Sequence, residues 1–118
     1  MIKFTYPREL RLLTPFDFSY VFQESIRAGS PFLTLVSRRN NLTHARLGFA
    51  IAKKQVKRAH ERNRIKRLVK EYFRYHQHQF PNIDFILMAK SPVTDLDNQQ
   101  IVEIFDKLCQ RIITKQKI

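Results

Sequence analysis

The spacing of apolar residues along the chain predicts alternating helices and strands. The first helix is expected over residues 14–25, because the Thr14 side chain can cap free backbone amides and Pro15 fits a first helical turn. Its aromatic residues divide between two faces, with Phe18 and Phe22 on one and Phe16 and Tyr20 on the other. One of these two aromatic faces must therefore lie outside the core or meet a second surface.

Two strands are expected next, over residues 31–39 and 45–52, where β-favouring side chains flank a polar turn at Asn40 and Asn41. This arrangement predicts a β-hairpin. In the second strand, bulky residues alternate with small ones, so one face of the strand is unusually open. The small residues predicted to form this face are Gly48, Ala50 and Ala52.

Three later segments complete the predicted fold. Residues 58–74 space their large apolar residues as a buried helix does, residues 84–89 form a continuous apolar run typical of an interior strand, and residues 98–114 return to helical spacing. We therefore expect an α+β sandwich in which helices pack on a small mixed sheet. The predicted order of elements is α-β-β-α-β-α, and a short extra strand is possible near residues 26–29. The 118 residues should form one RNA-binding domain with its core at about 8–114.

Charge narrows the range of partners. The chain carries 22 Lys and Arg against 10 Asp and Glu, a net charge of +12, which predicts a polyanionic partner. Nucleic acid is favoured over an anionic membrane, because no basic helix has a wide, unoccupied apolar face. Charge interrupts the N-terminal residues and no apolar run approaches a membrane span, so we expect no signal peptide and a cytoplasmic location.

Few residues suggest catalysis by the polypeptide itself. The acids are scattered and lack the clustering that a metal-dependent nuclease needs. His76 and His78 have no third candidate ligand at a recognisable spacing, and the single Cys109 is expected to be a small buried hydrophobe. We therefore predict neither a catalytic residue nor a metal site in the protein.

The strongest signal is positive charge concentrated around the helix at 58–74. Residues 53–74 contain ten of the Lys and Arg residues and only two acids. At about 100° per residue, the apolar stripe consists of Ile65, Leu68, Val69, Tyr72 and Phe73, and the polar side of Asn63, Lys66, Arg67, Lys70 and Arg74. Like charges at i, i+4 repel and cations disfavour a helix N-terminus, so this arrangement predicts contact with nucleic acid rather than with water alone.

Motifs in this region resemble the protein component of bacterial ribonuclease P. The stretch RLGFAIAKK at 46–54 is followed by RNRIKRLVKEYFR at 62–74, which contains the Arg-Asn-Arg helix of that family. RLLTPFDFSYVF at 11–22 is similar to the first helix of the family, and DFILMAKSP at 84–92 to the strand after its basic helix. The resemblance covers about residues 8–112.

The resemblance implies a protein cofactor for a catalytic RNA that cuts the 5′ leader from precursor tRNA, with the RNA and its Mg²⁺ ions performing the hydrolysis. It also implies a left-handed β-α-β crossover and a cleft between the first helix and the sheet that receives the leader. Together with the charge pattern, it predicts that Arg58, Arg62, Asn63, Arg64, Lys66, Arg67, Lys70 and Arg74 bind the catalytic RNA. The residues expected at the leader cleft are Phe18, Phe22, Lys53, Lys54 and Lys90.

Charge and fold alone leave two other nucleic-acid binders open. A structural RNA-binding protein of ribosomal type would need the cationic helix but no second, aromatic-lined basic cleft. A helix that reads DNA would not need a sheet groove behind it. The pairing of a cleft with the helix therefore favours the catalytic RNA and precursor tRNA as partners, with neither DNA nor a membrane among them.

Overall fold

The computed structural model describes Arg11 and residues 14–116. The charged segment 1–10, and with it the start of the predicted core at residue 8, lies outside the described residues. The elements in order are α1 (Pro15–Gln23), β1 (Ile26–Gly29), β2 (Leu33–Arg39), β3 (Arg46–Phe49), α2 (Ala59–His76), the 3₁₀ turn η2 (Gln77–Gln79), β4 (Ile83–Ala89), the 3₁₀ turn η3 (Ser91–Asp95) and α3 (Asn98–Gln116).

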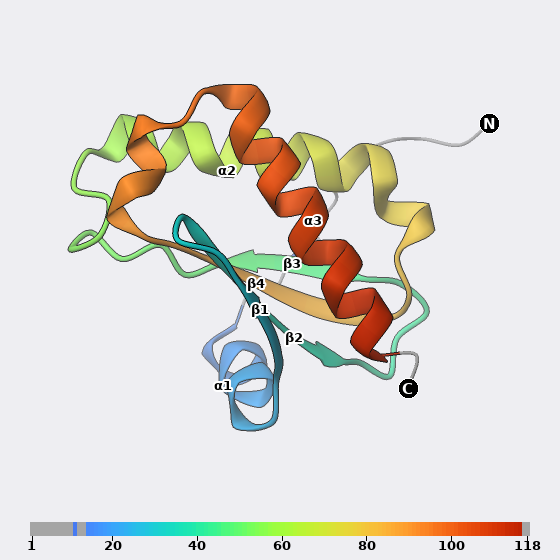
Figure 1. Cartoon of the computed structure of the whole chain (residues 1–118). Helices are drawn as coiled ribbons and strands as arrows, with labels where there is room; N and C mark the ends of the chain where they lie inside the picture. Colours follow the sequence, from blue (N-terminus) through green and yellow to red (C-terminus); the bar gives the residue numbers. More distant parts are fainter. Residues whose placement is uncertain (1–10, 12–13, 117–118) are drawn as a thin grey trace.

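The strands form one mixed sheet with helices on both faces (Figure 1). α2 and α3 cover one face, where the main core includes the fully buried Leu35, Leu47 and Phe85. α1 covers the other face through a smaller cluster around Val21. Since side chains alternate along a strand, β4 contributes to both cores. This confirms the prediction that 84–89 is an interior strand.

The strand order β1-β2-β4-β3 contradicts the predicted hairpin. β4 lies between β2 and β3, antiparallel to β2 and parallel to β3, so segments 31–39 and 45–52 do not pair with each other. The connecting loop is held across the start of β4 instead. Asn40 N donates to Asn82 O at 3.0 Å, and Asn40 Nδ2 donates to Asp84 Oδ1 at 2.7 Å. These polar residues therefore anchor the loop to β4 and do not close a tight turn.

The hairpin of this fold lies one strand earlier, between β1 and β2. In its turn, Ser30 Oγ accepts hydrogen bonds from the amides of Phe32 at 3.1 Å and Leu33 at 3.0 Å. β1 thus confirms the short extra strand expected near 26–29. α2 connects the parallel neighbours β3 and β4 in a β-α-β unit. The left hand of that crossover stays a prediction.

Side-chain caps explain where two of the helices begin. Thr14 Oγ1 accepts a hydrogen bond from Asp17 N at 3.1 Å, as predicted for the start of α1. At the start of α3, Asp97 Oδ1 accepts from Gln100 N at 2.8 Å, while Gln100 Oε1 accepts from Asp97 N at 3.0 Å. α1 is shorter than the predicted range, because Glu24 is already extended and leads into β1.

Candidate RNA interface

α2 buries one stripe of side chains and turns the opposite side outward. Ile65, Val69 and Phe73 are fully buried in the main core. Leu68 and Tyr72 are partly buried beside them, so the predicted apolar stripe is confirmed. Packing holds the helix in place, and its charged side remains accessible.

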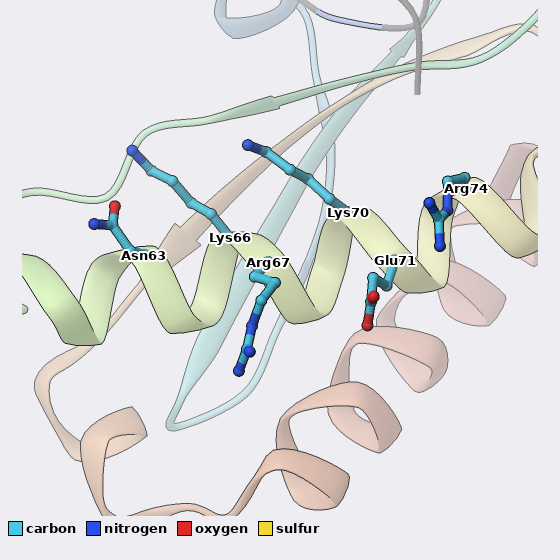
Figure 2. Close-up of a pocket in the computed structure, with 6 residues that line it drawn as sticks. All are labelled: Asn63, Lys66, Arg67, Lys70, Glu71 and Arg74. Carbon is cyan, nitrogen blue, oxygen red and sulfur yellow. The ribbon is translucent and has the colours of Figure 1, made fainter. Parts of the chain in front are cut away.

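The charged side of α2 borders a hollow of about 410 Å³ (Figure 2). The lining residues are Asn63, Lys66, Arg67, Lys70, Glu71 and Arg74. Figure 2 shows Lys66 and Lys70 extending to one side of the helix and Arg67 and Glu71 to the other. Within the described part of the chain, the side chains of Asn63, Lys66, Arg67 and Lys70 make no hydrogen bond or ion pair. Three positive groups and one amide are therefore available to an anionic partner.

Arginines extend this surface at both ends of α2. Near the C-terminal end, Arg74 Cζ lies 4.9 Å from the ring centre of Tyr75, whose side chain is exposed. At the other end, Arg58 occupies the N-cap position of α2, and its side chain makes no capping hydrogen bond. Arg58 lines a second hollow of about 560 Å³ together with Lys54 and Lys57. The positive surface thus continues from the helix into the loop that precedes it.

Arg62 and Arg64 instead direct their guanidinium groups at other parts of the protein. Arg62 Nη1 donates to the carbonyl oxygens of Val56 at 2.8 Å and Lys57 at 3.0 Å, in the loop before α2. Arg64 bonds to the segment before α3 and pairs with Glu61 at 3.1 Å. The structure therefore separates these two arginines from the exposed cations with which the sequence grouped them.

α1 and the adjoining sheet border the predicted leader cleft. Phe18 packs against the apolar cluster between them, whereas Phe22 remains 36 % exposed. Of the small residues predicted to form the open face of the second strand, Ala50 packs against the same cluster, Gly48 is buried and Ala52 is exposed beyond the end of β3. The two aromatic residues predicted for the cleft therefore comprise one anchored ring and one accessible ring.

The lysines predicted for the rim of that cleft lie in different surroundings. Lys90 Nζ donates to Ser30 O at 2.6 Å, which joins the end of β4 to the β1–β2 turn. Lys54 lines the hollow at the start of α2, and Lys53 is exposed in the same turn of the chain. The structure thus groups Lys54 with the arginine surface of α2.

An ion pair that sequence analysis missed joins α1, β3 and β4. Arg46 donates from Nε to Asp84 Oδ1 at 2.9 Å and from Nη2 to Asp84 Oδ2 at 2.7 Å, and its Nη1 lies 3.7 Å from Asp17 Oδ2. The hydrogen bond to Asp84, which is only 1 % exposed, raises the pKa of Arg46, and burial opposes that rise. The signal in the sequence was an aspartate heading an otherwise apolar strand, because a buried carboxylate needs a charged partner.

The second aromatic face of α1 also meets a cation. Arg38 Cζ lies 3.6 Å from the ring centre of Tyr20, and Arg38 Nη1 donates to Tyr20 O at 2.7 Å. Phe16, on the same face, is 77 % exposed. The prediction that one aromatic face lies outside the core or meets a second surface is therefore confirmed.

The remaining candidates for chemistry are few. Among the described residues, no three His, Cys, Asp or Glu side chains gather into a group that could hold a metal ion. In the same part of the chain, no helix is both long enough and apolar enough to cross a bilayer. Cys109 is buried, as predicted, and burial together with the nearby Asp106 raises the pKa of its thiol above the usual range. The thiol is therefore a packing group within α3.

Comparisons with known proteins agree with the resemblance read from the motifs. The ribonuclease P family model matches residues 6–113. Over 111 residues, the ribonuclease P protein component of Proteus mirabilis is 57 % identical and that of Yersinia enterocolitica 55 %, each alignment covering 94 % of this chain and 93 % of the relative. Among solved structures, a Staphylococcus aureus RNase P protein mutant is similar with a TM-score of 0.84 at 25 % identity, covering 92 % of this chain and 90 % of that one. The RNase P protein from Thermotoga maritima has a TM-score of 0.77 at 26 % identity, covering 86 % and 96 %. This chain belongs to the ribonuclease P protein family.

Proposed function

We propose that the protein is the RNA-binding cofactor of ribonuclease P and docks on the catalytic RNA through the exposed side of α2. The single observation that carries this placement is the set of side chains on α2 that make no hydrogen bond or ion pair within the described chain: Asn63, Lys66, Arg67 and Lys70, of which Lys70 has its Nζ 6.0 Å from the Phe49 ring centre. As a member of its family, the chain is the protein subunit of an endoribonuclease that matures the 5′ ends of tRNA. The family match favours this function over a structural RNA-binding protein of ribosomal type.

The chemistry of phosphate recognition explains the composition of the α2 surface. Each Lys or Arg that neutralises a phosphate releases condensed counterions, which favours association and makes it dependent on salt. Arg67 offers a planar fork to two phosphate oxygens, while Asn63 can donate and accept at a base or ribose edge. Arg58 and Arg74 lengthen the contact at either end. In this role the protein positions RNA, and the Mg²⁺ ions and the hydrolysis belong to the RNA subunit.

We further propose that the cleft beside α1 receives the single-stranded leader of precursor tRNA. The exposed ring of Phe22 supports this, because a base can stack on it without displacing core side chains. Phe18 anchors the wall of the cleft, and Arg27 Cζ lies 6.0 Å from the Phe22 ring centre. Lys53 and Lys90 would supply charge to the leader backbone. Since these RNAs are made in the bacterial cytoplasm, we place the protein there.

Leader removal by purified catalytic RNA tests the proposed function. At low salt and low Mg²⁺, adding the protein should increase the rate of leader removal from precursor tRNA. A Lys66→Ala variant should need a higher protein concentration for the same rate, because one phosphate contact is lost. Lys107→Ala is the matched control, since it removes the same charge from an exposed position on α3. An equal effect of both variants, or no acceleration by the unaltered protein, would contradict the proposal.

A further inference from the structure

Both terminal nitrogens of the Arg64 guanidinium group are engaged within the protein. Its Nη1 donates to Asn98 Oδ1 at 2.8 Å and to Leu96 O at 3.2 Å, and its Nη2 donates to Glu61 Oε2 at 3.1 Å and to Leu96 O at 3.2 Å. The remaining N–H donor, on Nε, is buried from solvent and has no hydrogen-bond partner among the described residues. A phosphate oxygen could therefore bind Arg64 only if some of these hydrogen bonds were broken or the buried Nε donor were uncovered.

Arg62 is engaged on one side only. Its Nη1 bridges two carbonyl oxygens of the loop before α2, while its Nε and Nη2 make no hydrogen bond within the described residues. The three side chains of the Arg-Asn-Arg motif thus differ in how available they are to RNA. Arg62 keeps Nε and Nη2 without a hydrogen bond in the described chain, Asn63 is exposed, and both terminal nitrogens of Arg64 donate to other parts of the protein. The adjacent Arg67 is exposed and unpaired, so it provides a natural comparison with Arg64.

Arg64 is connected through η3 to residues 53–58, the segment between β3 and α2 that we call the basic loop. Arg64 holds the carbonyl of Leu96, which directly follows η3. At the other end of η3, Ser91 N donates to Gln55 Oε1 in the basic loop at 3.2 Å. η3 therefore links Arg64 to the segment that carries the cations of the second hollow.

We infer that Arg64 is a positioning residue that holds η3 and the basic loop against α2, and that it does not bind phosphate. The inference rests on the proposed function and assigns one residue of that RNA-binding surface a different role. Glu61 already neutralises the Arg64 charge, so the charge attracts RNA less than that of Arg67. Lys57 and Arg58 lie in an irregular segment, and holding their backbone in place reduces the entropy lost when RNA binds.

Salt dependence separates a phosphate contact from a positioning role. Affinity for the catalytic RNA is measured at several salt concentrations for Arg64→Ala and for Arg67→Ala, which remove the same group. Arg67→Ala should lower the slope of log affinity against log salt by about 0.7 to 0.9, the amount for one phosphate contact. Arg64→Ala should weaken binding about tenfold at each salt concentration, the equivalent of one hydrogen bond to a charged group, with an unchanged slope.

Two further variants distinguish positioning from general damage to the fold. Arg64→Lys keeps the charge but cannot reproduce the four hydrogen bonds, so its affinity should stay as low as that of Arg64→Ala. Asn98→Ala removes one acceptor of Arg64 without altering α2, and should weaken RNA binding about threefold at an unchanged slope. This second variant keeps the test decisive if Arg64→Ala fails to fold.

A double-mutant cycle with Lys57→Ala tests whether Arg64 acts through the basic loop. If it does, the tenfold loss from Arg64→Ala should fall below about threefold when Lys57 is already absent, because the two residues act on one contact. Three results would overturn the inference about Arg64 but leave the proposed function standing. They are additive losses in the cycle, a slope change in Arg64→Ala equal to that of Arg67→Ala, and recovery of affinity in Arg64→Lys. If Lys66→Ala and Arg67→Ala also leave the slope unchanged, the proposed α2 interface fails and the inference fails with it.

Discussion

Replacing Arg46 by methionine is expected to leave the Asp84 carboxyl group without its cationic partner in the protein interior. Methionine keeps an unbranched apolar side chain of similar length but supplies neither the charge nor the two N–H groups that reach Asp84 at 2.9 and 2.7 Å. Among the described side chains, only the amide of Asn40, at 2.7 Å, would still donate to that carboxylate. Because Arg46 also approaches Asp17, the change removes a contact between β3 and α1 as well, beside the proposed leader cleft.

The size of the effect follows from the unequal burial of the two partners. Asp84 is 1 % exposed, so removal of its partner should cost about 3 to 5 kcal/mol of unfolding free energy. The Arg46 side chain is 20 % exposed and keeps Asp17 nearby, so Asp84→Asn should cost less, about 1 to 3 kcal/mol. An Arg46→Met/Asp84→Leu double variant removes both charges and should recover most of the stability lost in Arg46→Met.

Urea unfolding of the isolated protein, followed by circular dichroism, measures these differences. For a protein of this size, Arg46→Met should lower the midpoint by about 2 M. Lys107→Ala serves as the control for loss of an exposed charge and should stay within about 0.5 kcal/mol of the unaltered protein. The reasoning is refuted if Arg46→Met costs no more than Asp84→Asn, or if the double variant is less stable than Arg46→Met.

Three other expectations concern the leader, the core and alkaline pH. Phe22→Ala should weaken precursor tRNA binding by about 1 to 3 kcal/mol if a base stacks on the ring, while equal losses for tRNA without a leader would point to a damaged fold. Phe73→Ala should lower the unfolding free energy by about 3 to 5 kcal/mol, because the ring is fully buried in the main core. A loss below about 1 kcal/mol in urea unfolding would indicate that the ring lies outside the core. Burial raises the pKa of the Cys109 thiol, so the folded protein keeps a proton that the unfolded chain releases above about pH 8.5. Stability should therefore be fully present below that pH and decrease above it, by up to about 1.4 kcal/mol per pH unit. Cys109→Ala should show a shallower decrease in urea unfolding between about pH 8.5 and 9, below most of the titration of unfolded tyrosine, whose pKa is about 10. Parallel curves for the two proteins would contradict this account.

Sequence reasoning succeeded where neighbouring residues in the chain carry the information. The apolar stripe of α2, the cap at Thr14 and the interior strand that starts near Asp84 all follow from patterns within one element. The helical period also separated the cations of α2 from its buried side, because side chains three and four positions apart share a face. The Arg-Asn-Arg motif and its context then indicated the family, which the comparisons confirmed.

Strand order could not be obtained in the same way. The polar turn after β2 suggested a hairpin, but β4, more than forty positions along the chain, took the place beside β2. A strand that is apolar on both faces is most stable between two neighbours, with helices covering each side. That preference depends on which distant segments are available to pair, and the turn residues alone do not specify it.

The sequence by itself determined where positive charge accumulates, which side of α2 is buried, and to which family the chain belongs. Only the tertiary structure decided which of those charges face solvent. Arg64 meets Leu96 and Arg46 meets Asp84, partners more than thirty residues away, whereas Lys66 and Arg67 have none within the described chain. The physical reason is that a helical period fixes the direction of a side chain, while the partner of a guanidinium group depends on which carbonyl or carboxylate oxygens folding brings within its reach.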